Sequence, residues 1–349
     1  MTTSSTGVPN TDPPIDPDFR AGEPGARPSA GDGSDRRRVG DTVFRGLSVG
    51  AGALVIALVT LIGVFLLMQA IPALARNEAN FLTSSEWTVA GDHPRFGIAS
   101  MLWVTVSSSI IALLVAVPLG VGVALFLTQY APPWLQQPAA ALVDLLAAVP
   151  SIVYGLWGAL YFGFFIRDSG IQQGLNSVLG WIPIFATPPG STTVSSASTI
   201  FIIGLVLAIM ILPIITALSR EVFAQTPVTH KEGALALGAT KWEMIKTAVL
   251  PFGKPGVISA SMLGLGRALG ETVAVLIIVS ALAPSAPWSF SVFRGGETFA
   301  SRIANNAGEF DTPAKTGAYL AAGLVLFLLT FVVNAIARVV IERRKAFTE

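Results

Sequence analysis

The sequence predicts an all-α integral membrane protein with six transmembrane helices. Hydrophobic residues make up 52% of the chain and charged residues only 12%, and the mean hydropathy is +0.66, unlike an ordinary soluble domain. A spanning helix needs roughly 20 apolar residues. The stretches that reach this length are Leu47–Leu74, Ile98–Phe126, Pro138–Ile166, Ser198–Leu218, Val257–Leu282 and Gly317–Val340. The net charge of +1 gives no sign of nucleic-acid binding, and the absence of cysteine excludes disulfides and thiolate chemistry.

Residues 1–45 precede the first span and predict a disordered cytoplasmic tail. The part up to about Asp35 is rich in Pro, Gly, Ser, Thr and Asp, and Phe19 is its only aromatic residue, so it cannot bury enough surface to fold alone. It is not a cleavable signal, because the first apolar run starts far from the N-terminus and is too long for a signal core. Basic residues just before the span predict that the tail is cytoplasmic; they are Arg36, Arg37, Arg38 and Arg45.

Basic residues near the other span ends orient the chain, because cytoplasmic loops are enriched in Lys and Arg. Besides the four arginines of the tail, the cytoplasmic side holds Arg220, Lys231, Lys241, Lys246, Lys254, Arg338, Arg343, Arg344 and Lys345. The opposite side holds Arg76, Arg95, Arg167, Arg294, Arg302 and Lys315. The excess predicts that both termini are cytoplasmic.

The first transmembrane helix and an external loop occupy residues 46–97. The two largest external loops are expected at about Arg167–Ala197 and Ala283–Thr316. They contain Trp181, Trp288 and Phe290, which suit either the membrane interface or a docked partner.

The third span carries Asp144 near its cytoplasmic end, followed by Pro150. A carboxylate at membrane depth is costly and has a function or a partner. Asp144 and Pro150 are therefore candidates for a gate or a coupling element, and an interhelical hydrogen bond of Asp144 is the structural alternative. Pro213 predicts a kink in the fourth span, tolerated only through neighbouring groups.

The loop between the fourth and fifth spans, residues 219–254, predicts two short capped helices. Thr229 and Glu232 have the spacing of a capping box, and Gly238 is available for a left-handed turn at the C-terminal end of that helix. Thr240 and Glu243 form a second capping box, opening a helix that Pro251 is expected to stop. Such a firmly built cytoplasmic loop favours a docking surface.

Arg267 and Glu271 are four residues apart in the otherwise apolar fifth span. Residues at i and i+4 share a helix face, so the two charges can neutralise each other. Gly266 and Gly270 form a G-x-x-x-G pattern that lets a neighbouring backbone come close. Two interpretations remain open: a structural ion pair that locks two spans together, or a charged lining on a route for an anion.

Three motifs carry a family resemblance. Residues 232–238, with Pro251 downstream, resemble the EAA loop of bacterial ABC importer permeases, with Gly233 in place of the usual Ala. Gly266–Val275 resembles the phosphate-specific permeases and is closer to their PstC-type than to their PstA-type subunit. Ala148–Gly158 in the third span is a second match to the PstC-type subunit. The resemblance covers about Ile98 to Arg344.

The resemblance implies a type I ABC importer (MetI-like) permease fold, with the permease core at 98–345 after one extra N-terminal span. It implies a transmembrane subunit that translocates inorganic phosphate and pairs with a PstA-like permease. Two copies of a PstB-like ATPase would bind ATP and Mg, and a PstS-like phosphate-binding protein would deliver the substrate. Coupling would pass through residues 229–251, with Glu232, Gly233, Ala234 and Gly238 on the coupling helix.

Other chemistry finds little support. The chain has no G-x-x-x-x-G-K-[ST] phosphate loop, so it is not expected to hydrolyse ATP itself. Gly46–Gly50 matches G-x-S-x-G but lies at the start of a membrane helix, and the only histidines, His93 and His230, are expected on opposite sides of the membrane. They also give no basis for a transition-metal site. Two alternatives stay open: a permease for sulfate or molybdate, and a secondary transporter without an ATPase in which Arg267, Glu271 and Asp144 carry substrate or protons.

Overall fold

The computed structural model describes residues 34–91, 93–279 and 287–345, with side chains from residue 40 to 339 except Glu309. The chain divides into two compact units, 1–59 and 60–349. The first unit contributes the start of α1 (Ser34–Arg76). The predicted disordered tail lies outside the described residues up to residue 33, but residues 34–45 are helical, so the boundary at 45 is wrong. Extending an existing helix costs much less than starting one, and this stretch contains no proline.

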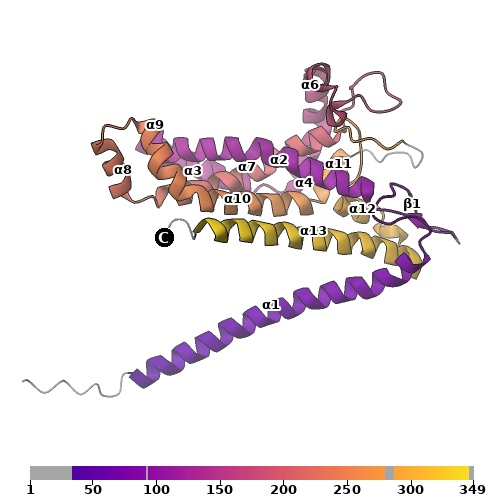
Figure 1. Ribbon diagram of the computed structural model, residues 1–349, viewed down its shortest axis with the longest axis horizontal. Helices are drawn as coiled ribbons and strands as arrows, with labels where there is room; N and C mark the ends of the chain where they lie inside the picture. Colours follow the sequence, from indigo (N-terminus) through magenta and orange to yellow (C-terminus); the bar gives the residue numbers. More distant parts are fainter. Residues whose placement is uncertain (1–33, 92, 280–286, 346–349) are drawn as a thin grey trace, which may run out of the picture. The chain divides into compact units, whose positions relative to one another are not determined.

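The second unit is a bundle around α7 (Ile200–Ala224). Figure 1 shows α2 (Ala99–Leu125) and α10 (Leu250–Gly270) running beside α7. The α7 side chains Ile203, Leu207 and Ile211 are at most 1% exposed. Small residues bring the three helices together, because a Cβ on Gly204 would lie 2.6 Å from the Cβ of Ile111. The fourth predicted span therefore forms the core.

Among the described residues, five helices are long and apolar enough to cross a membrane, and a bent pair makes a sixth if it counts as one span. The five are α1, α2 with the π-turn η1 (Phe126–Tyr130), α7, residues 241–270 and α13 (Pro313–Lys345). Within the second unit, the end of α1 packs on α13, where a Cβ on Gly317 would lie 2.8 Å from the Cβ of Ala73. The predicted all-α membrane architecture is confirmed.

The third predicted span is the bent pair. It consists of α3 (Pro133–Ala147) followed by α4 (Ser151–Trp157), the π-turn η2 (Gly158–Phe162) and α5 (Gly163–Asp168). The two halves meet at 85°, so the expectation of one helix over Pro138–Ile166 is wrong. Pro150 has no backbone N–H and disfavours the helical conformation at the residue before it, which breaks the helix between Ala147 and Ser151.

The fifth predicted span is also interrupted, in an unexpected place. The helix α9 (Lys241–Met244) runs through the π-turn η4 (Ile245–Val249) into α10 without stopping at Pro251. The π-turn explains this continuation, because it changes the hydrogen-bond pattern where the proline would clash. The helix instead ends at Gly270; Glu271 is extended with ψ 124°, and α11 (Val273–Ile278) follows.

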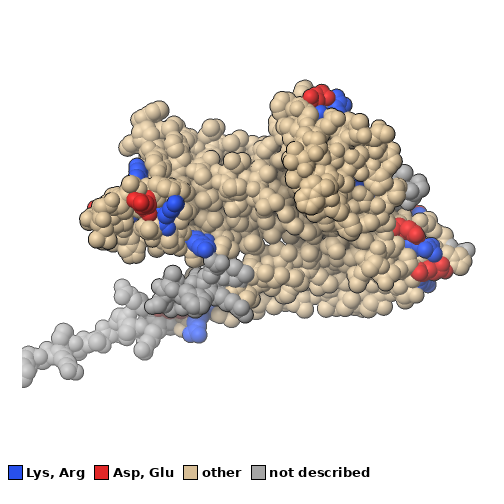
Figure 2. All heavy atoms as spheres, turned by 45° about the horizontal axis from the view of Figure 1, so that its top comes forward, with Lys and Arg blue, Asp and Glu red and all other residues tan. Residues whose placement is uncertain are grey.

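The two ends of the bundle differ. One end carries α8 (Val228–Ala236) with α9, and the other carries the hairpin β1 (Trp87–Thr88) and β2 (Arg95–Phe96), α6 (Ile171–Leu179), the 3-10 turns η3 (Pro183–Phe185) and η5 (Ala307–Glu309), and α12 (Phe299–Asn305) (Figure 1). On the face drawn in Figure 2, most described charged side chains lie toward these two ends, and a band almost without charge lies between them. This distribution suits an apolar surround of the central band.

The segment predicted as an external loop at Ala283–Thr316 is folded over much of its described length. Every residue from 291 to 299 except Arg294 is buried. The backbone N–H groups of Ile200 and Phe201 donate to Arg294 and Val292, which joins the segment to the start of α7. A plain loop is therefore the wrong description for the part that follows residue 290.

Candidate functional site

Arg267 and Glu271 lie on either side of the end of α10. Arg267 is exposed on the last turn of the helix, while Glu271 is 9% exposed. The Glu271 Oε1 atom accepts a hydrogen bond from the backbone N–H of Ala274 at 3.1 Å and so caps α11. No ion pair joins Arg267 and Glu271 among the described residues, and the prediction that they share a helix face is wrong because the helix stops between them.

Arg267 borders an open pocket of about 430 Å³ between α7, α10 and α13. The other residues of its wall are Ile214, Met262, Leu263, Gly266 and Asn334. Among the described residues, Arg267 and Asn334 are the polar residues of the pocket wall, and Arg267 is its one charged residue.

Close helix packing uses other small residues than the sequence indicated. A Cβ on Gly266 or Gly270 would meet nothing within 4 Å among the described atoms, so the predicted close approach at this G-x-x-x-G pattern does not occur within the chain. Instead Ala260, Gly264 and Ala268 are buried, and a Cβ on Gly264 would lie 3.1 Å from Ile215 of α7. Because these three are spaced by four, they form one face toward α7, which leaves the face with Gly266 and Gly270 open.

The two interrupted spans meet at α4 and α11. A Cβ on Gly155 would lie 2.7 Å from the Cα of Ala274, so only glycine fits this crossing without a shift. The Tyr154 hydroxyl donates to the carbonyl of Leu146 at 2.9 Å and so bridges the break between α3 and α4. Both breaks and the Arg267 charge therefore belong to one region of the second unit.

The structure confirms part of the prediction of two short capped helices between the fourth and fifth spans. Gly238 has φ +84°, the left-handed turn expected after the first helix, and the capping box of Thr240 and Glu243 is complete in both directions. The capping box at Thr229 is wrong, because the N-cap of α8 is Pro227, two residues earlier, and it has no side-chain hydrogen bond. Proline has no backbone N–H and ends a helix on its N-terminal side, so α8 begins directly after Pro227.

The residues of the EAA-like loop present an exposed surface. Glu232 and Gly233 are exposed, and Leu237 is 90% exposed. Ala234 faces inward and is half-buried against a cluster that includes Met244 and Ile245. Val228, Leu235 and Trp242 of the same hairpin are exposed as well. Several exposed apolar side chains on one short hairpin favour a contact with another protein.

Asp144 and Pro150 belong to the bent pair, whereas Arg267 lies at the end of α10. Asp144 is exposed on α3 and its Oδ2 atom lies 3.5 Å from Nη2 of Arg220 on α7. Pro150 is the N-cap residue of α4, at the break of the bent pair. The structure thus gives Asp144 an interhelical partner and gives Pro150 a place at the bend.

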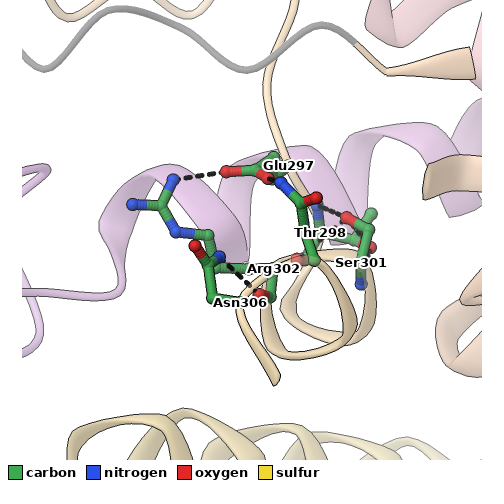
Figure 3. Close-up of polar contacts among 6 residues, drawn as sticks. Glu297, Thr298, Ser301, Arg302 and Asn306 are labelled. Atoms are coloured by element: carbon green, nitrogen blue, oxygen red, sulfur yellow. Dashed lines mark hydrogen bonds and ion pairs between the residues drawn. The ribbon is translucent and has the colours of Figure 1, made fainter. Parts of the chain in front are cut away.

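A further polar cluster at α12 escaped the sequence analysis. Figure 3 shows Arg302 pointing toward Glu297, whose side chain is 3% exposed, and the two form an ion pair. Asn305 Nδ2 also donates to Glu297 at 3.1 Å, and Thr298 with Ser301 caps the helix. The T-x-x-S spacing of Thr298 and Ser301 could have predicted the start of α12. The burial of Glu297 could not be predicted, because it depends on contacts between residues far apart in the sequence.

Comparison with known proteins identifies the family. The family described as "Binding-protein-dependent transport system inner membrane component" matches residues 116–346. The chain belongs to this family. It is therefore a membrane-spanning permease subunit of an ABC transporter and, by family, not itself an enzyme.

The permease has close relatives along most of its length. "Phosphate transport system permease protein PstC 2" of Mycobacterium tuberculosis is 51% identical over 304 residues, 87% of this chain and 92% of the relative. The protein named PstC in Mycobacterium leprae is 54% identical over 278 residues, 79% of this chain and 85% of the relative. A structure titled "Inward facing conformations of the MetNI methionine ABC transporter" aligns with a TM-score of 0.47 and 13% identity, covering 71% of the permease and 94% of that chain.

Proposed function

We propose that this permease carries inorganic phosphate across the bacterial cytoplasmic membrane as one half of the channel of an ATP-driven importer. The relatives reported above are named for phosphate transport. The observation that carries the proposal is Arg267, an exposed cation in a helix apolar enough to span a membrane. Because a charge at membrane depth faces protein or an aqueous path, an exposed arginine there needs an anion or a partner subunit.

Arg267 is suited to the anion. A guanidinium keeps its charge at any working pH and its fork of donors matches phosphate oxygens. The open face at Gly266 and Gly270 leaves room for the substrate and for a second permease beside Arg267. Glu271 brings a buried negative charge within the same break, which would weaken the hold on the anion so that it can leave.

The partners follow from the same proposal. A PstA-like permease would complete the channel, a PstS-like protein would deliver phosphate, and two PstB-like ATPases would bind ATP and Mg, for which this chain has no phosphate loop. The coupling helix would be α8, and Glu232, Gly233, Ala234 and Gly238 would fit the ATPase. The exposed Leu237 and the left-handed Gly238 support this assignment.

The proposed orientation places the α8–α9 end and both termini in the cytoplasm and the β-hairpin end outside, on the basis of the Lys and Arg count. Asp144 and Pro150, near the break of the bent pair, would then lie on the cytoplasmic half of the third span and act as a gate or as structural support. The contact of Asp144 with Arg220 of α7 supports a role in holding α3 on the bundle.

The experiment is ATP-dependent phosphate uptake by proteoliposomes that contain the assembled importer, with sulfate and molybdate as competitors. Phosphate uptake with little competition is expected. Gly238→Pro, or Ala234→Trp against the half-buried Ala234 site, should uncouple hydrolysis from uptake while the permease still inserts. Uptake without an ATPase would favour a secondary transporter, and strong competition by sulfate or molybdate would assign another oxyanion; either result contradicts the proposal.

A further inference from the structure

A second cavity, of about 460 Å³, lies where η1, α3, α7 and α8 meet. It shares no residue with the Arg267 pocket. A water molecule takes up about 30 Å³ in the liquid, so the cavity has room for a small ion and several waters. Its polar wall consists of Thr128, Gln136, Gln137, Arg220, Glu221 and Lys231.

Arg220 contributes a donor that nothing in the described chain uses. Its Nη2 atom makes only the 3.5 Å contact with Asp144. Its Nη1 atom is buried and has no hydrogen-bond partner among the described residues. A buried donor without an acceptor is costly and rare in folded proteins, so a small shift of the Arg220 side chain that brings Nη1 to an acceptor in the cavity would be favourable.

Lys231 adds a second cation from another helix, because it belongs to α8 while Arg220 belongs to α7. Within the described part of the chain, no carboxylate lies within ion-pair distance of Lys231. Glu221 is the one acidic residue of the wall, and it already accepts a hydrogen bond from Gln225 at 3.2 Å. Glu221 and Asp144 offset the two cations in charge, but in the described part of the chain neither carboxylate is within ion-pair distance of Lys231. The exposed Gln137 adds an amide donor.

We propose that this cavity is a second anion site, which binds a tetrahedral oxyanion of the phosphate class between Arg220 and Lys231. A guanidinium and an ammonium group from two different helices complement an ion that accepts on several sides. The ion is either free phosphate or the headgroup phosphate of an anionic lipid, which offer the same oxygens.

The site has a consequence for regulation, which rests on the proposed function. If α8 is the coupling helix, an anion held by Lys231 connects it to α7 and to α3, whose residues form the other walls. The site would lie on the cytoplasmic side, where imported phosphate accumulates. Bound phosphate would then restrain the movement of α8 and slow further import.

Thiol labelling tests the site without any need for transport. The chain has no cysteine, so Ala140→Cys introduces a single thiol on the cavity wall, and Ala224→Cys on the same wall replaces it if the first variant does not assemble. The assembled importer in phosphatidylcholine nanodiscs is labelled with and without inorganic phosphate, with chloride at equal ionic strength as reference. At ten times the dissociation constant, phosphate should slow labelling about tenfold.

The lipid composition of the nanodiscs distinguishes free phosphate from a lipid headgroup, and two lysine variants test whether Lys231 binds the anion. Protection by inorganic phosphate identifies the free ion, and protection only in phosphatidylglycerol nanodiscs identifies the lipid headgroup. Lys231→Gln should abolish the protection, whereas Lys254→Gln, which removes an exposed cation outside the cavity, should preserve it.

The absence of protection in both arms, as expected if a partner protein fills the cavity, overturns the proposal, and so does protection that survives Lys231→Gln. Because labelling and uptake are measured separately, failure of phosphate transport would refute the proposed function and leave this result standing.

Discussion

Replacing Glu271 by Ala and by Gln separates its two roles. The carboxylate accepts from the Ala274 N–H at 3.1 Å and is 9% exposed. Glu271→Ala removes the cap and leaves a buried N–H without an acceptor, which should lower the free energy of unfolding by about 1–3 kcal/mol. Glu271→Gln retains an acceptor oxygen and should stay close to the original stability.

The charge of Glu271 has a different consequence. A neutral amide could cap α11 with less desolvation than a carboxylate at membrane depth, so the proposed role of Glu271 in transport, unlike the cap, requires its charge. We expect Glu271→Gln to assemble but to lose phosphate uptake, and Glu271→Ala to lose both. Thermal denaturation of the purified importer and uptake in proteoliposomes measure the two effects. Equal stability of both variants would refute the cap, and normal uptake by Glu271→Gln would refute the charge role.

Three further predictions concern packing, the α12 cluster and orientation. Gly155→Ala should destabilise the permease by about 1–3 kcal/mol because its Cβ would meet the α11 backbone, while Gly174→Ala, with nothing within 4 Å, should not; equal denaturation midpoints would contradict this. Glu297→Ala should cost about 1–3 kcal/mol by leaving its arginine without a carboxylate, and Glu297→Gln less; denaturation that does not distinguish them would refute the role of the pair. Thr240→Cys should be labelled from the cytoplasm and Ala90→Cys from outside, and the reverse would overturn the orientation.

Local sequence signals predicted the parts of the structure that depend on neighbouring residues. The apolar runs located the helices, and the capping box at Thr240 and the left-handed Gly238 formed as expected. These features need only a few adjacent residues to form. The error at Thr229 has the same local nature, since the helix begins directly after Pro227, two residues before the predicted cap.

The misses depend on tertiary contacts. The interruption after Gly270 leaves no mark in the hydropathy of the span, because α11 is as apolar as the helix before it. The face of α10 that packs on α7 follows from the position of Gly264 rather than from the more visible pattern at Gly266 and Gly270. Burial of Glu297 likewise requires α12 to fold back onto the bundle. The helix break, the face of α10 that packs on α7 and the burial of Glu297 each depend on the positions of helices distant in the sequence. These positions cannot be derived from local sequence patterns.

Phosphate uptake by the Arg267→Gln importer tests the central claim most directly. Arg267 makes no ion pair among the described residues and borders the open pocket beside α7 and α13, so its removal should leave folding and assembly unchanged. The account predicts that ATP-dependent phosphate uptake in proteoliposomes is lost although the ATPase still co-purifies, and that Arg267→Lys recovers part of it, because lysine keeps the charge without the guanidinium fork. Uptake by Arg267→Gln at the original rate would contradict the account.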